Sequence, residues 1–186
     1  MGMVGSPGSG LTRVGLALLA TPARRGPVAF LDVRGWLCPL AAWECGVPPD
    51  RLVVVRCPDR RLWPQVAAAL LDGVPAVYAE VPAGVGAAEL RRLGALARAR
   101  KTAVILRPLQ GELPAGLTYV QLRAGEVSWE GPEAGHGRLR RRRVELCISG
   151  RGVGGQEAVV EVEDDGADTL RVVPGLAAPA ARRAVG

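Results

Sequence analysis

The residues at positions 5–12, "GSPGSGLT", have the spacing best suited to phosphate chemistry in this sequence. They follow the pattern G-x-x-x-x-G-K-[S/T], in which backbone N–H groups and the start of a helix surround phosphate oxygens. Gly5, Gly8 and Gly10 keep the backbone permissive, and Thr12 keeps the hydroxyl that holds magnesium in such loops. Leu11 stands where the pattern has its lysine, so the charge for the β- and γ-phosphates is missing.

Two interpretations of this loop stay open from the eight residues alone. A Gly- and Ser-rich stretch can match the pattern by chance, or the loop can be a phosphate loop that has lost its chemistry. Basic residues are not scarce in the chain, which has 24 of them, of which Lys101 is the single lysine. An arginine would have kept the positive charge, so the leucine points to a loop without phosphoryl-transfer activity.

The segments that must position this loop alternate between helical and extended patterns. After the short apolar start "MGMV", residues 12–24, 36–45, 63–72 and 87–100 have helical periodicity. Short apolar runs at 27–33, 51–57, 75–81 and 102–108 predict buried strands between these helices. Alternation of this kind predicts an α/β fold with a mostly parallel sheet flanked by helices.

After Pro108 the pattern changes to strands with short connections. Strands are expected at 117–123, 126–130, 142–149, 157–163 and 169–173, and they predict an antiparallel β extension of the sheet. The expected division is a core over residues 1–150, a C-terminal β-hairpin extension over 151–173 and a disordered tail over 174–186.

From the loop to "GVPAVYAEVPAGV", the order of segments resembles the core of the RecA recombinase family over roughly residues 4–150. "LDVRGWLCPLAAWECGV" supplies Asp32, together with the family's Leu-x-Pro and closing Gly-Val. Arg34 falls where the family has the glutamate that activates water. Glu80 falls where it has an aspartate that supports magnesium.

Leu11 removes the positive charge that neutralises the phosphates, and Arg34 removes the carboxylate that activates water. Phosphoryl transfer depends on such positioning and charge neutralisation. The resemblance therefore implies a RecA-like protein that is not an enzyme and uses no cofactor. Its vestigial nucleotide loop comprises Gly5, Gly8, Gly10, Leu11, Thr12, Asp32, Arg34 and Glu80. An alternative stays open: an ATP-binding RecA-like ATPase with a deviant loop that borrows Arg13, or a neighbouring subunit's arginine, for the missing lysine.

Small Arg- and Ala-rich chains of this kind, and the segment at 127–152, resemble the ImuA-type accessory factors of actinobacterial mutagenesis cassettes. That resemblance implies a cytoplasmic protein of the SOS response that acts in translesion synthesis. Its expected partner is a Y-family DNA polymerase homologue of the ImuB type, with a replicative polymerase in the same pathway. The interface is expected mainly within residues 117–173. A second resemblance, to the RecA-like SOS cell-division inhibitors, implies a tubulin-like GTPase as partner instead.

One basic cluster and several tryptophans are candidate contacts. The cluster comprises Arg138, Arg140, Arg141, Arg142 and Arg143. It can contact nucleic-acid phosphates or serve as a charge ladder on an edge strand. Few aromatics accompany it, so any DNA contact is expected to be weak. Trp36, Trp43 and Trp129 are candidate partner-binding residues if they prove exposed.

The overall composition narrows the classes of function. The net charge is +6 with a pI near 9.9, which suits an anionic partner. Four cysteines without a C-x-x-C pair and a single histidine do not support a zinc or Cys–His site. No apolar run reaches membrane-spanning length, so no membrane partner is expected.

Overall fold

The computed structural model describes residues 1–131, 140–165 and 170–173. They form one nine-stranded sheet in the order β3-β2-β4-β5-β1-β6-β7-β8-β9. The six strands from β3 to β6 are parallel, and β7, β8 and β9 are each antiparallel to the strand before them. The expectation of an α/β fold with a mostly parallel sheet and an antiparallel C-terminal extension is therefore confirmed.

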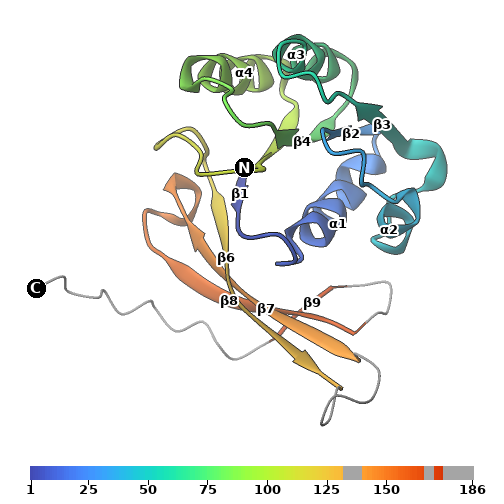
Figure 1. Ribbon diagram of the computed structural model, residues 1–186, viewed down its shortest axis with the longest axis vertical. Coiled ribbons are helices and arrows are strands. Elements are labelled where there is room, and N and C mark those ends of the chain that lie inside the picture. The colour runs from blue at the N-terminus through green and yellow to red at the C-terminus, as the bar shows by residue number, and fades with distance from the viewer. Residues whose placement is uncertain (132–139, 166–169, 174–186) are drawn as a thin grey trace, which may run out of the picture.

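The parallel part alternates strands and helices as the sequence predicts. Its elements are β1 (Gly2–Val4), α1 (Leu11–Ala23), β2 (Val28–Asp32), α2 (Pro39–Glu44), β3 (Leu52–Arg56), α3 (Trp63–Gly73), β4 (Ala76–Val81), α4 (Ala87–Arg100) and β5 (Ala103–Pro108). Short 3-10 helices occur at Pro49–Arg51 and Arg151–Val153. Helices α3 and α4 lie on one face of the parallel strands, with α1 and α2 on the other (Figure 1).

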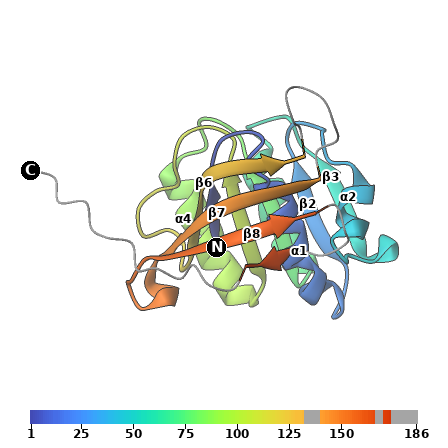
Figure 2. The same cartoon turned by 90° about the horizontal axis from the view of Figure 1, so that it is seen from below.

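The C-terminal strands are β6 (Gln121–Glu130), β7 (Arg141–Ser149), β8 (Ala158–Asp164) and β9 (Arg171–Val172). Two strands expected at 117–123 and 126–130 are thus one strand, whose pairing with β7 shifts register between Ala124 and Val127. This irregularity includes Gly125, and it explains why the pattern looked like two strands. Figure 2 looks onto β6, β7 and β8, which lie side by side in front of α1.

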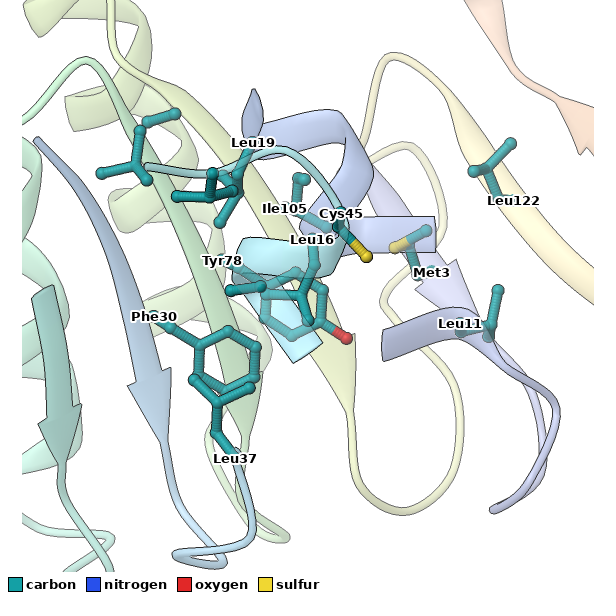
Figure 3. Close-up of a cluster of buried hydrophobic side chains, with 14 of the residues drawn as sticks. Met3, Leu11, Leu16, Leu19, Phe30, Leu37, Cys45, Tyr78, Ile105 and Leu122 are labelled. Carbon is teal, nitrogen blue, oxygen red and sulfur yellow. The ribbon is translucent and has the colours of Figure 1, made fainter. Parts of the chain in front are cut away.

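Two hydrophobic cores lie on opposite faces of the sheet. One packs α3 and α4 against β4 and β5 around Trp63, Val77 and Leu90. The other packs α1 and α2 against Phe30 of β2 and Tyr78 of β4 (Figure 3). This second core also contains Val144, Leu146 and Val162, so β7 and β8 pack on the same core as α1. None of the helices in the described ranges is long and apolar enough to cross a membrane. The tail at 174–186 lies outside these ranges.

Helix α1 lies so close to the sheet that Gly15 has no room for a side chain. A Cβ at this position would lie 2.1 Å from a ring carbon of Tyr78, and the Tyr78 ring stacks on Phe30 at a centroid distance of 4.6 Å. The ring cannot give way without disturbing this stacked pair. Gly15 therefore sets the distance between α1 and β4.

We predict opposite effects of the same substitution at two helix-interior glycines. Gly15→Ala should lower the free energy of unfolding by about 1–3 kcal/mol, because the new methyl collides with Tyr78. Gly94→Ala in α4 meets its nearest side-chain carbon, in Leu117, at an ordinary 3.8 Å. It should stabilise by about 0.4–1 kcal/mol. Urea denaturation followed by circular dichroism measures both, and equal effects would contradict the close packing at Gly15.

Candidate functional site

The loop at residues 5–12 joins β1 to α1 at the carboxyl edge of the parallel strands. Asp32 ends β2, and Glu80 and Arg107 lie opposite each other near the ends of β4 and β5. Above them is a pocket of about 390 Å³, whose walls include Gly8, Gly10 and Thr12 of the loop. Arg34, Glu80, Arg107 and Arg142 also line this pocket. Of the eight residues that the sequence assigned to a vestigial nucleotide loop, five line this pocket and three do not: Gly5, Leu11 and Asp32.

Two glycines of the loop adopt a left-handed backbone conformation. Gly8 and Gly10 have φ angles of 84° and 78°, in the left-handed region that other residues avoid. Gly10 is the N-cap of α1, which has no side-chain cap and no acidic residue in its first turn. The N–H groups at the start of α1 therefore have no side-chain acceptor in the described part of the chain.

Leu11 is a core residue. Its side chain is fully buried and belongs to the same cluster as Met3 and Leu122 (Figure 3). A Cβ on Gly5 would lie 2.9 Å from a methyl carbon of Leu11, so this glycine leaves the space that the leucine occupies. The residue at the lysine position thus fills the core under the loop and does not line the pocket above it.

Asp32 uses both carboxylate oxygens to hold the turn that follows β2. Its Oδ1 accepts hydrogen bonds from the N–H groups of Gly35 and Trp36, and its Oδ2 accepts one from Leu37. The side chain is 1% exposed. The three N–H donors satisfy the hydrogen-bonding capacity that burial would otherwise leave unmet, and they tie Asp32 to the turn.

Glu80 holds the same turn from the neighbouring strand. Its Oε2 accepts from the backbone N–H groups of Val33 and Arg34, and its Oε1 accepts from Nε and Nη2 of Arg34. The Arg34 guanidinium also lies 4.8 Å from the centre of the Trp36 ring. Arg34 and Glu80 both differ from the residues that the RecA family has at these positions. In this chain they pair with each other, and the arginine neutralises the buried glutamate.

The C-terminal strands cover the loop from the other side. The Arg142 guanidinium of β7 lies 2.7–2.9 Å from where a Cβ on Gly10 would be, and it pairs with Asp164 of β8 at 2.7 Å. Arg13 of α1 pairs with the same aspartate and with Glu44 of α2, each at 3.2 Å. Arg13 is therefore held in ion pairs on α2 and β8, which does not favour it as a replacement for the lysine.

The basic cluster is largely neutralised within the sheet. Arg141 and Arg143 of β7 each pair with Glu130 of β6 and Glu163 of β8. Strand β7 lies between β6 and β8, so the interpretation of this cluster as an edge-strand ladder is wrong. Arg140 is exposed, and Arg138 lies outside the described residues. The arginines serve cross-strand pairing, and their contact with nucleic acid stays a prediction.

The sequence analysis missed two residues, Arg107, which lines the pocket, and Tyr78, whose hydroxyl lies near Arg107 and Thr12. Arg107 of β5 is 5% exposed, and its Nη1 has no hydrogen-bond partner in the described part of the chain. Tyr78 of β4 is fully buried, and burial raises the pKa of its hydroxyl, against the opposing effect of the nearby Arg107 charge. That hydroxyl lies near Thr12 and Arg107 without a hydrogen bond of normal geometry. The sequence held one signal that could have identified Arg107: it is a charged residue near the end of an apolar run that predicts a buried strand.

The candidate partner-binding tryptophans are exposed. Trp36 is 74% exposed, and Leu40 and Trp43 on α2 are also exposed. We call these three residues the Trp36–Trp43 patch. Trp129 on β6 is exposed too, with its ring 5.5 Å from the Arg142 guanidinium. Because large apolar side chains of this kind are favoured anchors at protein interfaces, the patch is a candidate docking surface.

We predict that Arg34 and Glu80 are strongly coupled in a double-mutant cycle with Arg34→Met and Glu80→Gln. Their coupling free energy should be about 1–3 kcal/mol, because Glu80 is buried and each single change leaves one charge uncompensated. The matched control is the exposed Arg123–Glu112 pair, which should couple by less than about 1 kcal/mol. Equal coupling in the two cycles, from urea denaturation, would refute the role given to Glu80.

Comparison with known proteins gives one family. Residues 2–114 match the family model described as the MT3502 N-terminal domain. The match covers more than half of the chain, so the chain belongs to this family. It runs from β1 to beyond β5 and ends before β6. No curated protein matches the sequence.

Proposed function

We infer that this member of the MT3502 N-terminal domain family is a non-catalytic RecA-like protein that acts in DNA-damage-induced mutagenesis. In this proposal it serves as an accessory factor of translesion synthesis and binds a Y-family DNA polymerase homologue, with a replicative polymerase in the same pathway. The observation that carries the non-catalytic part is the use of Asp32 and Glu80 to hold the turn after β2.

The RecA-like assignment is supported by where the motif residues lie. A glycine-rich loop connects the first strand to the first helix, and the carboxylates end two neighbouring strands at the same edge of the sheet. This is the arrangement that the resemblance to RecA requires of Asp32 and Glu80. The match to the MT3502 N-terminal domain covers these same elements.

The absence of catalysis follows from three side chains. Leu11 is buried in the core, and Arg34 occupies the position of the water-activating glutamate and pairs with Glu80. A phosphoryl-transfer site without its lysine and its general base loses several kcal/mol of transition-state stabilisation. A protein with this loop acts through its surface, and the cross-strand pairing of Arg141–Arg143 favours protein over DNA as its main partner.

We predict no ATP hydrolysis by the natural chain and none by Leu11→Lys. The lysine would replace a fully buried leucine, so it should lower stability by about 3–5 kcal/mol. Arg34 would still occupy the place of the glutamate. Phosphate release measures turnover, and urea denaturation measures stability. Leu18→Lys, at an exposed position of the same helix, is the control and should change stability little. Turnover by Leu11→Lys would show that Arg34 does not occupy the glutamate position.

The surface best suited to the partner is the Trp36–Trp43 patch. Its exposed apolar side chains are close together in sequence, on α2 and the turn that Asp32 and Glu80 hold. The same buried hydrogen bonds that remove the nucleotide chemistry therefore fix the patch in place. This shifts the proposed interface from residues 117–173 toward α2, with Trp129 as the rival position.

We predict that the double variant Trp36→Ser and Trp43→Ser loses co-purification with the Y-family polymerase homologue. Truncation of aromatic hot spots typically costs 2 kcal/mol or more, which corresponds to at least about 30-fold in affinity. Leu62→Ser, at another exposed apolar position, is the matched control and should bind normally. Circular dichroism should show that all variants are folded.

A Trp129→Ser variant tests the rival position. Loss of the complex in this variant alone would move the interface to β6, and full binding by every variant would contradict both patches. Point variants are preferable to truncation after residue 150, because β8 pairs with β7 and its Val162 belongs to the core around α1.

A further inference from the structure

Arg107 is a buried cation that the described part of the chain does not neutralise. It is 5% exposed, and within the described ranges no carboxylate lies within ion-pair distance of its guanidinium. Its neighbour across the strand pair is Glu80, whose oxygens are already engaged by Arg34 and by two backbone N–H groups. An arginine cannot shed its proton to relieve this burial, and an unpaired buried charge costs several kcal/mol. The energetics favour an anion from outside the chain.

A second positive group, the start of α1, lines the same pocket. Helix α1 is 13 residues long, and its first turn carries neither a side-chain cap nor an acidic residue. Gly8, Gly10 and Thr12 line the 390 Å³ pocket together with Arg107. Helix N-termini attract anions through their free N–H groups and their dipole. Two independent elements, the α1 terminus and a β5 side chain, thus favour negative charge at one place.

The same pocket includes Thr12 but offers a divalent metal ion no carboxylate that is free of hydrogen bonds from the chain. Asp32 and Glu80 are its neighbouring carboxylates, and each is saturated with hydrogen bonds from the turn at 33–37. In the described ranges, no group of three metal-binding side chains is present. Magnesium binds phosphate-bearing ligands through carboxylate and water oxygens, so its usual protein contribution is absent here. The expected ligand is an oxyanion held by arginine and backbone alone.

We propose that this pocket binds a phosphate group without a metal ion, through the Arg107 guanidinium and the N–H groups at the start of α1. The phosphate comes either from free phosphate or pyrophosphate or from a small phosphorylated molecule. Phe30, Trp36 and Leu37 add an apolar wall beside the charged part of the pocket. Arg142 and Arg13, paired with Asp164, form its rim and do not supply the unpaired charge.

Isothermal titration calorimetry of the full chain, in phosphate-free buffer with a chelator, tests the site with inorganic phosphate, pyrophosphate and ADP. Saturable binding of phosphate or pyrophosphate is expected. ADP that binds no tighter than pyrophosphate identifies the free anion as ligand, and tighter ADP binding identifies a phosphorylated molecule. No saturable binding of any probe, or binding that requires added magnesium, would overturn the proposal.

Variants of Arg107 link the binding to this side chain. Arg107→Met should weaken binding by about 10- to 100-fold, the effect of a charge-assisted hydrogen bond, and Arg107→Lys should retain part of it. Arg91→Met removes the same charge from an exposed position on α4, in a separate groove with Met1 and Tyr119, and should bind like the natural chain. Unchanged binding by Arg107→Met would refute the assignment.

Thermal unfolding distinguishes a ligand-binding role of Arg107 from a structural one. In phosphate-free buffer, Arg107→Met should unfold at the same temperature as the natural chain or higher, because it removes an uncompensated buried charge. Added phosphate should raise the unfolding temperature of the natural chain, and the same phosphate concentration should raise that of Arg107→Met by less. A variant that is unstable without phosphate would assign Arg107 to folding and contradict the proposal.

Discussion

Two buried carboxylates at the carboxyl edge of the sheet, Asp32 and Glu80, must be compensated, and the structure around the loop depends on how this is done. Between them they accept hydrogen bonds from five backbone N–H groups in the turn at 33–37 and from the Arg34 side chain. The turn is therefore fixed from two strands at once. It places Leu37 in the core and Trp36 at the surface.

Because Asp32 and Glu80 are engaged by the turn at 33–37, the backbone arrangement at this edge and the arrangement of its charged side chains must be considered separately. Two loop glycines have positive φ angles, α1 begins without a side-chain cap, and Glu80 and Arg107 lie opposite each other near the ends of β4 and β5. The charges are arranged differently, because Leu11 serves the core and Arg34 serves Glu80. What is left over is Arg107, a cation on β5 whose charge no described carboxylate pairs with. The buried Arg107 and the uncapped start of α1, which line one pocket, are the basis of the proposed anion site, and the different use of Leu11 and Arg34 is the basis of the proposed lack of phosphoryl transfer.

The C-terminal strands β7 and β8 supply ion-pairing side chains around the loop, as the parallel strands also do. Asp164 of β8 pairs with Arg142 above Gly10 and with Arg13 of α1, while Val162 of the same strand enters the core beneath. The Arg13–Asp164 pair joins residues 151 positions apart in sequence. These contacts make β7 and β8 a cover for the loop, and they explain why dense arginine in β7 does not amount to a dense positive surface.

The sequence by itself determined the local features. The apolar runs and helical periods located α1 and α3 to within a residue or so of their ends, because burial on one side of an element repeats with its own period. It also singled out the loop and the residues at 11, 34 and 80, whose types and spacing are local properties; their assignment to a former nucleotide site stays a prediction. The split of β6 into two strands was wrong because a register shift around Gly125 mimics a turn.

Which charged side chains form ion pairs is known only from the tertiary structure. That Arg34 pairs with Glu80, that Arg142 lies over Gly10, and that Arg107 is buried without a described partner all depend on how strands distant in sequence are ordered in the sheet. Strand order is set by long-range packing and not by any local pattern, and electrostatic pairing acts over a few ångströms in space. The charge arrangement at this edge therefore followed from the fold, and the sequence pointed to Asp32, Arg34 and Glu80 but not to Arg107.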